Sequence, residues 1–115
     1  MWRPAGSSLP LYIQLRILAV EIGVEIWEWT STLAVEDKLA VKHAVTLDEV
    51  DDCFFGNYSR AFRRGRSGSY AMYGRTDAGR YLLVLFYLRD YTAHVATARD
   101  MDDAERRWYR EQTRT

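Results

Sequence analysis

The sequence contains a single cysteine, Cys53, so no disulfide can form within the chain. Cys53 lies in the apolar run CFF, which favours a small buried side chain over a nucleophile. Only two histidines are present, and no pair of cysteines accompanies them, so the sequence has no metal-binding signature. We therefore expect neither a metal ion nor an organic cofactor.

Several motifs of catalytic and membrane proteins are also missing. The sequence has no G-x-S-x-G nucleophile elbow, no glycine-rich phosphate loop and no spaced carboxylate pair on strands. The early apolar run LYIQLRILAVEIGV carries Arg16 and Glu21, is too short to cross a bilayer and lacks a following cleavage site. We expect residues 1–21 to be a disordered or dispensable extension before a single domain over residues 22–115. The sparing use of cysteine fits a cytoplasmic location.

Charge is distributed unevenly along the chain. Residues 1–55 hold four basic and nine acidic side chains, and 4 − 9 gives a net charge of −5. Residues 56–115 hold twelve arginines, no lysine and seven acidic side chains, and 12 − 7 gives +5. A guanidinium group binds phosphate or carboxylate through two parallel hydrogen bonds, so the second part suits an anion. The acidic first part suits a basic partner or the basic second part of the same chain. The other interpretation of this uneven charge is that the side chains are ordinary solvated surface groups.

Hydropathy patterns predict an α+β domain. Alternation predicts a strand over residues 22–29, helical spacing predicts a helix that ends near His43, and a capping box at Thr46 and Glu49 begins a second helix to about Phe55. Four strands and a last helix follow, with the strands expected at residues 58–64, 69–75, 80–88 and 92–99. The sheet is expected to be antiparallel with four strands, or five if the first strand joins it.

Turn and cap residues set the predicted boundaries of these elements. Gly56 is expected to end the second helix in the left-handed conformation. Asp77 and Gly79 suit the turn between two strands. Asp100 is expected to cap the last helix, whose first turn also carries acidic residues that the helix dipole favours.

Three arginines stand where the predicted strands end. Arg75 and Arg80 flank one turn, and Arg99 ends the next strand. If these guanidinium groups share one pocket, they can bind RNA and stabilise the negative charge that develops on phosphorus when a 2′-hydroxyl attacks. Such cleavage needs no metal ion but does need an acid and a base, a role that we assign to His43. The other interpretation of His43 is a cation that interacts with a helix dipole.

Three further side chains are expected to contact the substrate. Lys42 lies next to the proposed catalytic histidine, and Tyr73 and Tyr109 can stack on bases. A place in the hydrophobic core is the alternative for both tyrosines. His94 lies within a predicted strand, where a packed or surface histidine is favoured over a catalytic one.

Four segments match a known family in their order: IWEW, VKHAVTLDEVDDCFF, YGRTDAGRYLLVLFY and VATARDMDDAERRWYRE, over residues 25–111. This order resembles the BrnT-like toxins of type II toxin–antitoxin systems, which are small ribonucleases with a RelE-like fold. The resemblance implies ribosome-independent RNA cleavage, growth inhibition and neutralisation by a cognate BrnA-like antitoxin, with DNA bound only through the antitoxin. The matching basic positions are Lys42, His43, Arg75, Arg80 and Arg99.

The chain departs from the family pattern in three places, of which Thr97 in place of a serine is conservative. Ala44 stands where the family has glycine, and the stretch RSGSYAMY before Gly74 lacks the family's acidic residue. If that acidic residue takes part in catalysis, a second hypothesis applies, in which the domain binds RNA or an antitoxin without cleaving. A third hypothesis, from analogy of fold alone, is a relative that poisons DNA gyrase.

Overall fold

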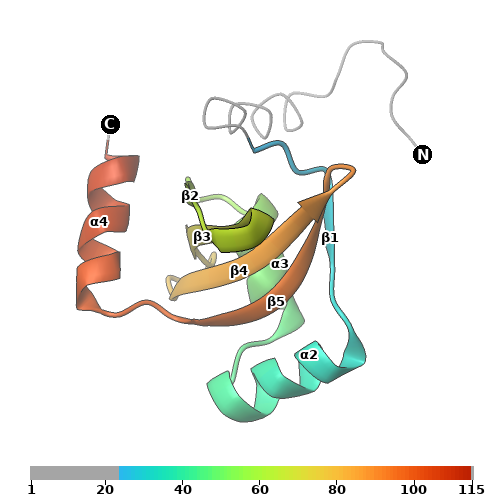
Figure 1. Cartoon of the computed structure of the whole chain (residues 1–115). Coiled ribbons are helices and arrows are strands. Elements are labelled where there is room, and N and C mark those ends of the chain that lie inside the picture. Colours follow the sequence, from blue (N-terminus) through green and yellow to red (C-terminus); the bar gives the residue numbers. More distant parts are fainter. Residues whose placement is uncertain (1–23, 115) are drawn as a thin grey trace.

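A five-stranded sheet forms the centre of the domain in the computed structural model, which describes residues 24–114 (Figure 1). The elements in chain order are β1 (Glu28–Thr30), α2 (Leu33–Lys38), the π-helix η2 (Leu39–His43), α3 (Leu47–Phe55), β2 (Ala61–Arg64), the 3-10 helix η3 (Arg66–Gly68), β3 (Ser69–Arg75), β4 (Tyr81–Arg89), β5 (Thr92–Asp100) and α4 (Asp103–Thr113). The α+β class is confirmed. Strands β2 to β5 form an antiparallel meander, but β1 pairs in parallel with β5, so the sheet is mixed. The expectation of a wholly antiparallel sheet is wrong, because the chain returns through the helices before the meander begins.

Helix α3 begins where its capping box predicts. The Thr46 hydroxyl accepts a hydrogen bond from the Glu49 amide at 3.1 Å, and the Glu49 carboxylate accepts one from the Thr46 amide at 3.0 Å. Gly56 ends the helix with a φ of −84°, so its expected left-handed conformation is wrong. Glycine is still required there, since a Cβ would lie 2.4 Å from the Asp52 carbonyl oxygen.

The first predicted helix divides into two segments. The Thr32 hydroxyl caps α2 by accepting from the Val35 amide at 3.2 Å. The chain then widens into the π-helix η2, which contributes the fully buried Leu39 to the core. This helix ends at Ala44, whose φ of 53° lies in the left-handed region that glycine adopts more easily.

The main core lies between the sheet and the helices α2, η2 and α3. Leu82, Val84 and Phe86 of β4 are fully buried and point to this side, because side chains alternate along a strand. Phe54 of α3 packs edge-on against Phe86, with ring centroids 5.6 Å apart, and stacks on Trp29 of β1 at 6.1 Å. These contacts join the helices and the first strand to the meander.

Helix α4 packs on the opposite face of the sheet and covers only part of it (Figure 1). A second, smaller core forms there from Tyr73, Leu83, Met101 and Tyr109. The N-cap of α4 is Asp102, whose carboxylate accepts from the Glu105 amide at 2.8 Å and whose amide donates back to Glu105 at 2.9 Å. The expectation that Asp100 caps this helix is therefore wrong; Asp100 is the last residue of β5, and its carboxylate binds Arg80.

The first strand begins later than predicted. Strand β1 begins at Glu28 rather than near residue 22, although Val24 and Ile26 before it are buried. The predicted extension over residues 1–21 lies outside the described part of the chain. Within residues 24–114, no helix has the length and apolar character needed to span a membrane.

Candidate functional site

Arg80, one of the expected catalytic arginines, is neutralised inside the fold. Its Nε and Nη2 atoms donate to the two carboxylate oxygens of Asp100 at 2.8 and 3.1 Å, and Nη1 donates to Glu49 at 3.0 Å. The carbonyl oxygens of Ala44 and His43 accept two further bonds at 2.8 and 3.1 Å. The hydrogen bond with Asp100 is the main reason why the pKa of Arg80 is raised. With all three nitrogens occupied, Arg80 stabilises the fold and does not offer a free guanidinium group to a phosphate.

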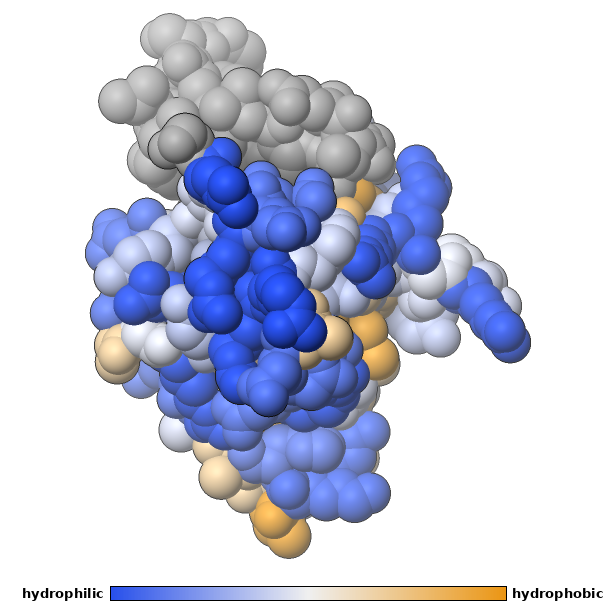
Figure 2. Space-filling model, turned by 90° about the vertical axis from the view of Figure 1, so that its left-hand side faces the viewer, coloured by the Kyte–Doolittle hydropathy of each residue, from blue (hydrophilic) through white to orange (hydrophobic). Residues whose placement is uncertain are grey.

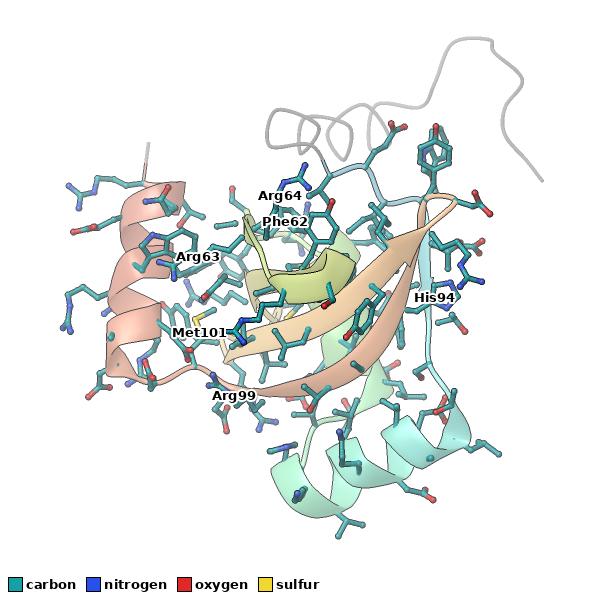
Figure 3. The ribbon with its side chains drawn as sticks, in the orientation of Figure 1. Phe62, Arg63, Arg64, His94, Arg99 and Met101 are labelled. Carbon is teal, nitrogen blue, oxygen red and sulfur yellow. The ribbon has the colours of Figure 1, made fainter. Side chains whose placement is uncertain are left out.

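Arg99 is occupied in a similar way at the end of β5 (Figure 3). Its Nη1 and Nη2 atoms each donate to a carboxylate oxygen of Glu105 at 2.8 Å, which is the two-pronged geometry of a strong ion pair. This contact raises the pKa of Arg99 and lowers the pKa of Glu105. Arg99 therefore ties the last strand to the first turn of α4.

Arg75 lies apart from both of these ion pairs. Its guanidinium carbon is 4.2 Å from the ring centroid of Tyr58 and 5.2 Å from that of Tyr81. Within residues 24–114 its guanidinium group forms no hydrogen bond or ion pair, and its Nε atom is buried without a partner. Within the described residues, carboxylates therefore bind Arg80 and Arg99 but not Arg75, so the three guanidinium groups do not stand together as free anion-binding groups.

Among the other expected site residues, Tyr109 lines a pocket together with Arg75, whereas Lys42, His43 and Tyr73 do not. Lys42 and His43 lie in the last turn of η2, with the sheet between them and α4. Tyr73 is 5% exposed and packs against Trp108 with ring centroids 4.6 Å apart, so it belongs to the small core. Tyr109 is also buried, and its hydroxyl donates to the Ser59 carbonyl oxygen at 2.6 Å. Burial raises the pKa of Tyr109.

A pocket of about 530 Å³ lies between the sheet and the C-terminal half of α4. Its lining is rich in arginine and tyrosine and consists of Tyr58, Ser59, Arg75, Tyr81, Arg107, Tyr109, Arg110, Glu111, Thr113 and Arg114. We call it the arginine–tyrosine pocket. Arg75 and Tyr81 are directly opposite each other on β3 and β4. The helical arginines are Arg107 and Arg110 of α4 and its C-cap Arg114. Their spacings of three and four residues place them on one side of the helix.

The arginine–tyrosine pocket carries an excess of positive charge. Four arginines and one carboxylate, Glu111, give 4 − 1, a net charge of +3. No ion pair neutralises any of these five side chains within residues 24–114. The C-terminal end of a helix carries a partial charge of about −0.5, which is too small to offset this excess. A buried N–H without an acceptor, such as Nε of Arg75, costs about 1–3 kcal/mol, and an anionic ligand can remove that cost.

The helical arginines of the pocket were missed by the sequence reasoning. No residue of the segment ERRWYREQTR other than Tyr109 was expected at the site. Its spacing of Arg107, Arg110 and Arg114 was the signal that one face of the helix is basic. The side of the molecule on which α4 lies is mostly hydrophilic, as Figure 2 shows.

A second exposed group lies on the part of the sheet that α4 leaves open. Tyr87 on β4 and His94 on β5 are directly opposite in register, and both are exposed. Arg89 follows two residues after Tyr87 on the same face of β4, so it lies diagonally from His94. Of the two expected places for His94, packed or on the surface, the structure shows the surface; Figure 3 places it beside β1, far along β5 from Arg99.

Metal and thiol chemistry find little support in the described residues. No group of three or more histidine, cysteine, aspartate or glutamate side chains in residues 24–114 could hold a metal ion. Burial raises the pKa of the Cys53 thiol to about 12, so the nucleophilic thiolate is scarce at neutral pH. The buried interpretation of Cys53 is confirmed.

Comparison of the sequence with family models and with curated proteins gives no match. The fold and the site therefore define the protein as an α+β domain with a five-stranded mixed sheet and a basic pocket. The resemblance to BrnT-like toxins stays a prediction.

Proposed function

We propose that this protein binds RNA, with a phosphate in the arginine–tyrosine pocket, as the toxin component of a toxin–antitoxin pair. The observation that carries the proposal is a pocket with four arginines that no ion pair neutralises within residues 24–114. A guanidinium group binds phosphate through charge-assisted hydrogen bonds, and exposed tyrosine rings bind bases by stacking. Tyr58 supplies such a ring at the pocket, with 38% of its surface exposed. The order of motifs along the chain supports the assignment to a toxin–antitoxin pair.

The binding proposal is tested with a fluorescently labelled single-stranded RNA of about ten nucleotides, within the range that small binding domains cover. We expect Arg75→Ala and Arg110→Ala each to weaken binding about 10- to 100-fold, because a hydrogen bond to a charged group contributes about 1.5–3 kcal/mol. Arg66→Ala is the matched control, since it removes the same charge from an exposed position outside the pocket. If all three variants bind RNA equally well, the pocket is not the RNA site.

RNA cleavage is a second candidate activity, and the exposed group on the open sheet favours it. His94 supplies an imidazole as acid or base, Arg89 supplies a positive charge, and Tyr87 supplies a ring for stacking. Directly opposed residues of an antiparallel pair have Cβ atoms about 5 Å apart, so the two side chains can act on one substrate. This set is proposed in place of His43, Arg80 and Arg99, because carboxylates of the domain already bind both of those arginines.

Cleavage is measured with the same RNA in the presence of a metal chelator. We expect His94→Ala to abolish cleavage without weakening binding, whereas His43→Ala, the other histidine, should cleave normally. Growth inhibition after induced expression, and its relief by the product of a neighbouring gene, test the toxin–antitoxin assignment separately. Binding without any cleavage by the unaltered protein would leave the non-catalytic function. Damage to DNA replication with intact RNA would instead favour a gyrase poison.

A further inference from the structure

The chemistry of Arg75 restricts which phosphate the arginine–tyrosine pocket suits. Tyr58 and Tyr81 lie against the guanidinium group, so its donors are left at the edge of the planar group. One of these donors, Nε, is buried and has no acceptor in the described part of the chain. Gly79 is also close, since a Cβ there would lie 3.5 Å from Nη2 of Arg75. The guanidinium group of Arg75 therefore lacks an acceptor in the described residues, and a phosphate oxygen bound in the pocket would supply one.

The charge of the pocket points to a ligand with more than one negative charge. The net charge of +3 exceeds the single charge of a phosphodiester inside an RNA strand. A terminal phosphomonoester carries about −1.5 to −2 at neutral pH and has three free acceptor oxygens. An internal phosphodiester has two free oxygens, and the RNA strand continues on both sides of it. The terminal group thus matches the donors and the charge better.

The size of the pocket indicates that more than a bare phosphate is bound. Ligand sites in proteins have volumes of about 300–1,000 Å³, and this pocket of about 530 Å³ lies within that range. The partly exposed ring of Tyr58 is available at the pocket for one base, in addition to its contact with Arg75. One terminal nucleotide with its phosphate therefore accounts for both the arginines and the tyrosine.

We infer that the arginine–tyrosine pocket binds the phosphorylated end of an RNA strand, with the terminal phosphate on Arg75 and the helical arginines. This inference rests on the proposed binding of RNA and narrows its substrate to strands with a terminal phosphomonoester. It goes beyond phosphate binding in general because the pocket would distinguish the phosphate at the end of a strand from the phosphates inside it.

The test compares RNAs of one sequence that differ only at one end. The ends are a hydroxyl, a 5′-phosphate, a 3′-phosphate, and the same phosphates blocked by a methyl ester. We expect one phosphate form to bind about tenfold more tightly than the hydroxyl form, and its methyl ester to lose most of that advantage, since the ester removes one charge and one oxygen. Comparison of the two phosphate positions shows which end is bound.

Variants assign this preference to the pocket. Arg75→Ala should remove the preference for the phosphate end, and Arg75→Lys should recover only part of it, because lysine keeps the charge without the two-pronged donor. The Arg110 side chain is exposed, so Arg110→Ala should reduce the preference for the phosphate end without affecting folding. Arg66→Ala should keep that preference. Equal affinity for all ends, with RNA binding still dependent on Arg75, would overturn the inference and leave the proposed function intact. RNA binding that no pocket variant weakens would instead overturn the proposed function.

Discussion

Replacing Arg80 with alanine tests whether this arginine stabilises the fold or takes part in a reaction. The substitution removes five side-chain hydrogen bonds, three to carboxylates and two to backbone carbonyls. Hydrogen bonds to charged groups contribute about 1.5–3 kcal/mol each when buried. The Arg80 side chain is 26% exposed and that of Asp100 is 61% exposed, so water replaces part of what is lost. We expect the free energy of unfolding to fall by about 3 kcal/mol in total.

A loss of that size is easily measured. It corresponds to a decrease in Tm of about 12–24 °C for a domain of this length. Urea unfolding followed by circular dichroism gives the free energy directly, and Arg66→Ala, an exposed arginine, should stay within about 0.5 kcal/mol of the unaltered protein. Arg80→Lys should recover less than half of the loss, because an ammonium group cannot form all five bonds.

Two results would refute this reasoning. One is a stability change below about 1 kcal/mol for Arg80→Ala, which would mean that the network contributes little. The other is unchanged stability together with a loss of RNA binding as large as that of Arg75→Ala. In that case Arg80 would belong to the binding site, and the correction made from its contacts would be wrong.

Two further predictions concern acid and the backbone. The hydrogen bond from Arg80 lowers the pKa of Asp100 below its ordinary 3.8, so Asp100 stabilises the fold above that value and ceases to do so as the pH falls through its lower pKa in the folded state. The urea concentration at the unfolding midpoint should therefore decrease when the pH is lowered below about 4. This decrease should be smaller in Arg80→Ala than in the unaltered protein. Ala44→Gly should raise the free energy of unfolding by about 1 kcal/mol, because Ala44 has a φ of 53°. Ala40→Gly, inside η2, should lower it by about 0.5–1 kcal/mol in the same assay, and equal effects at both positions would contradict the backbone argument.

Local sequence patterns predicted most elements of the fold. The capping box at Thr46 and Glu49 and the alternation in the meander depend on contacts between near neighbours, which the sequence contains. The parallel pairing of β1 with β5 joins residues more than sixty positions apart, as in Glu28 with Thr92, and no local pattern indicates it. The π-helix was also missed, because its hydrophobic spacing resembles that of an ordinary helix end.

The site was harder to predict than the fold because the role of an arginine depends on its partners. Arg75, Arg80 and Arg99 occupy similar places at strand ends in the sequence. In the described part of the chain, Glu49 and Asp100 bind Arg80, Glu105 binds Arg99, and no carboxylate binds Arg75. Those carboxylates lie up to thirty-one positions away, so composition and spacing could not show which arginine stays free.

The charge of the arginine–tyrosine pocket has the same physical origin as the stability of α4. The acidic residues of this helix lie mainly in and before its first turn, where the helix dipole favours them, and the cap, Arg99 and Arg106 engage them there. The arginines of its second half lie where the dipole favours cations, beyond the reach of those carboxylates. One sequence pattern, acidic first and basic last, thus stabilises the helix and leaves its end positively charged. An anion bound there would take the place of the missing carboxylates without disturbing the cap.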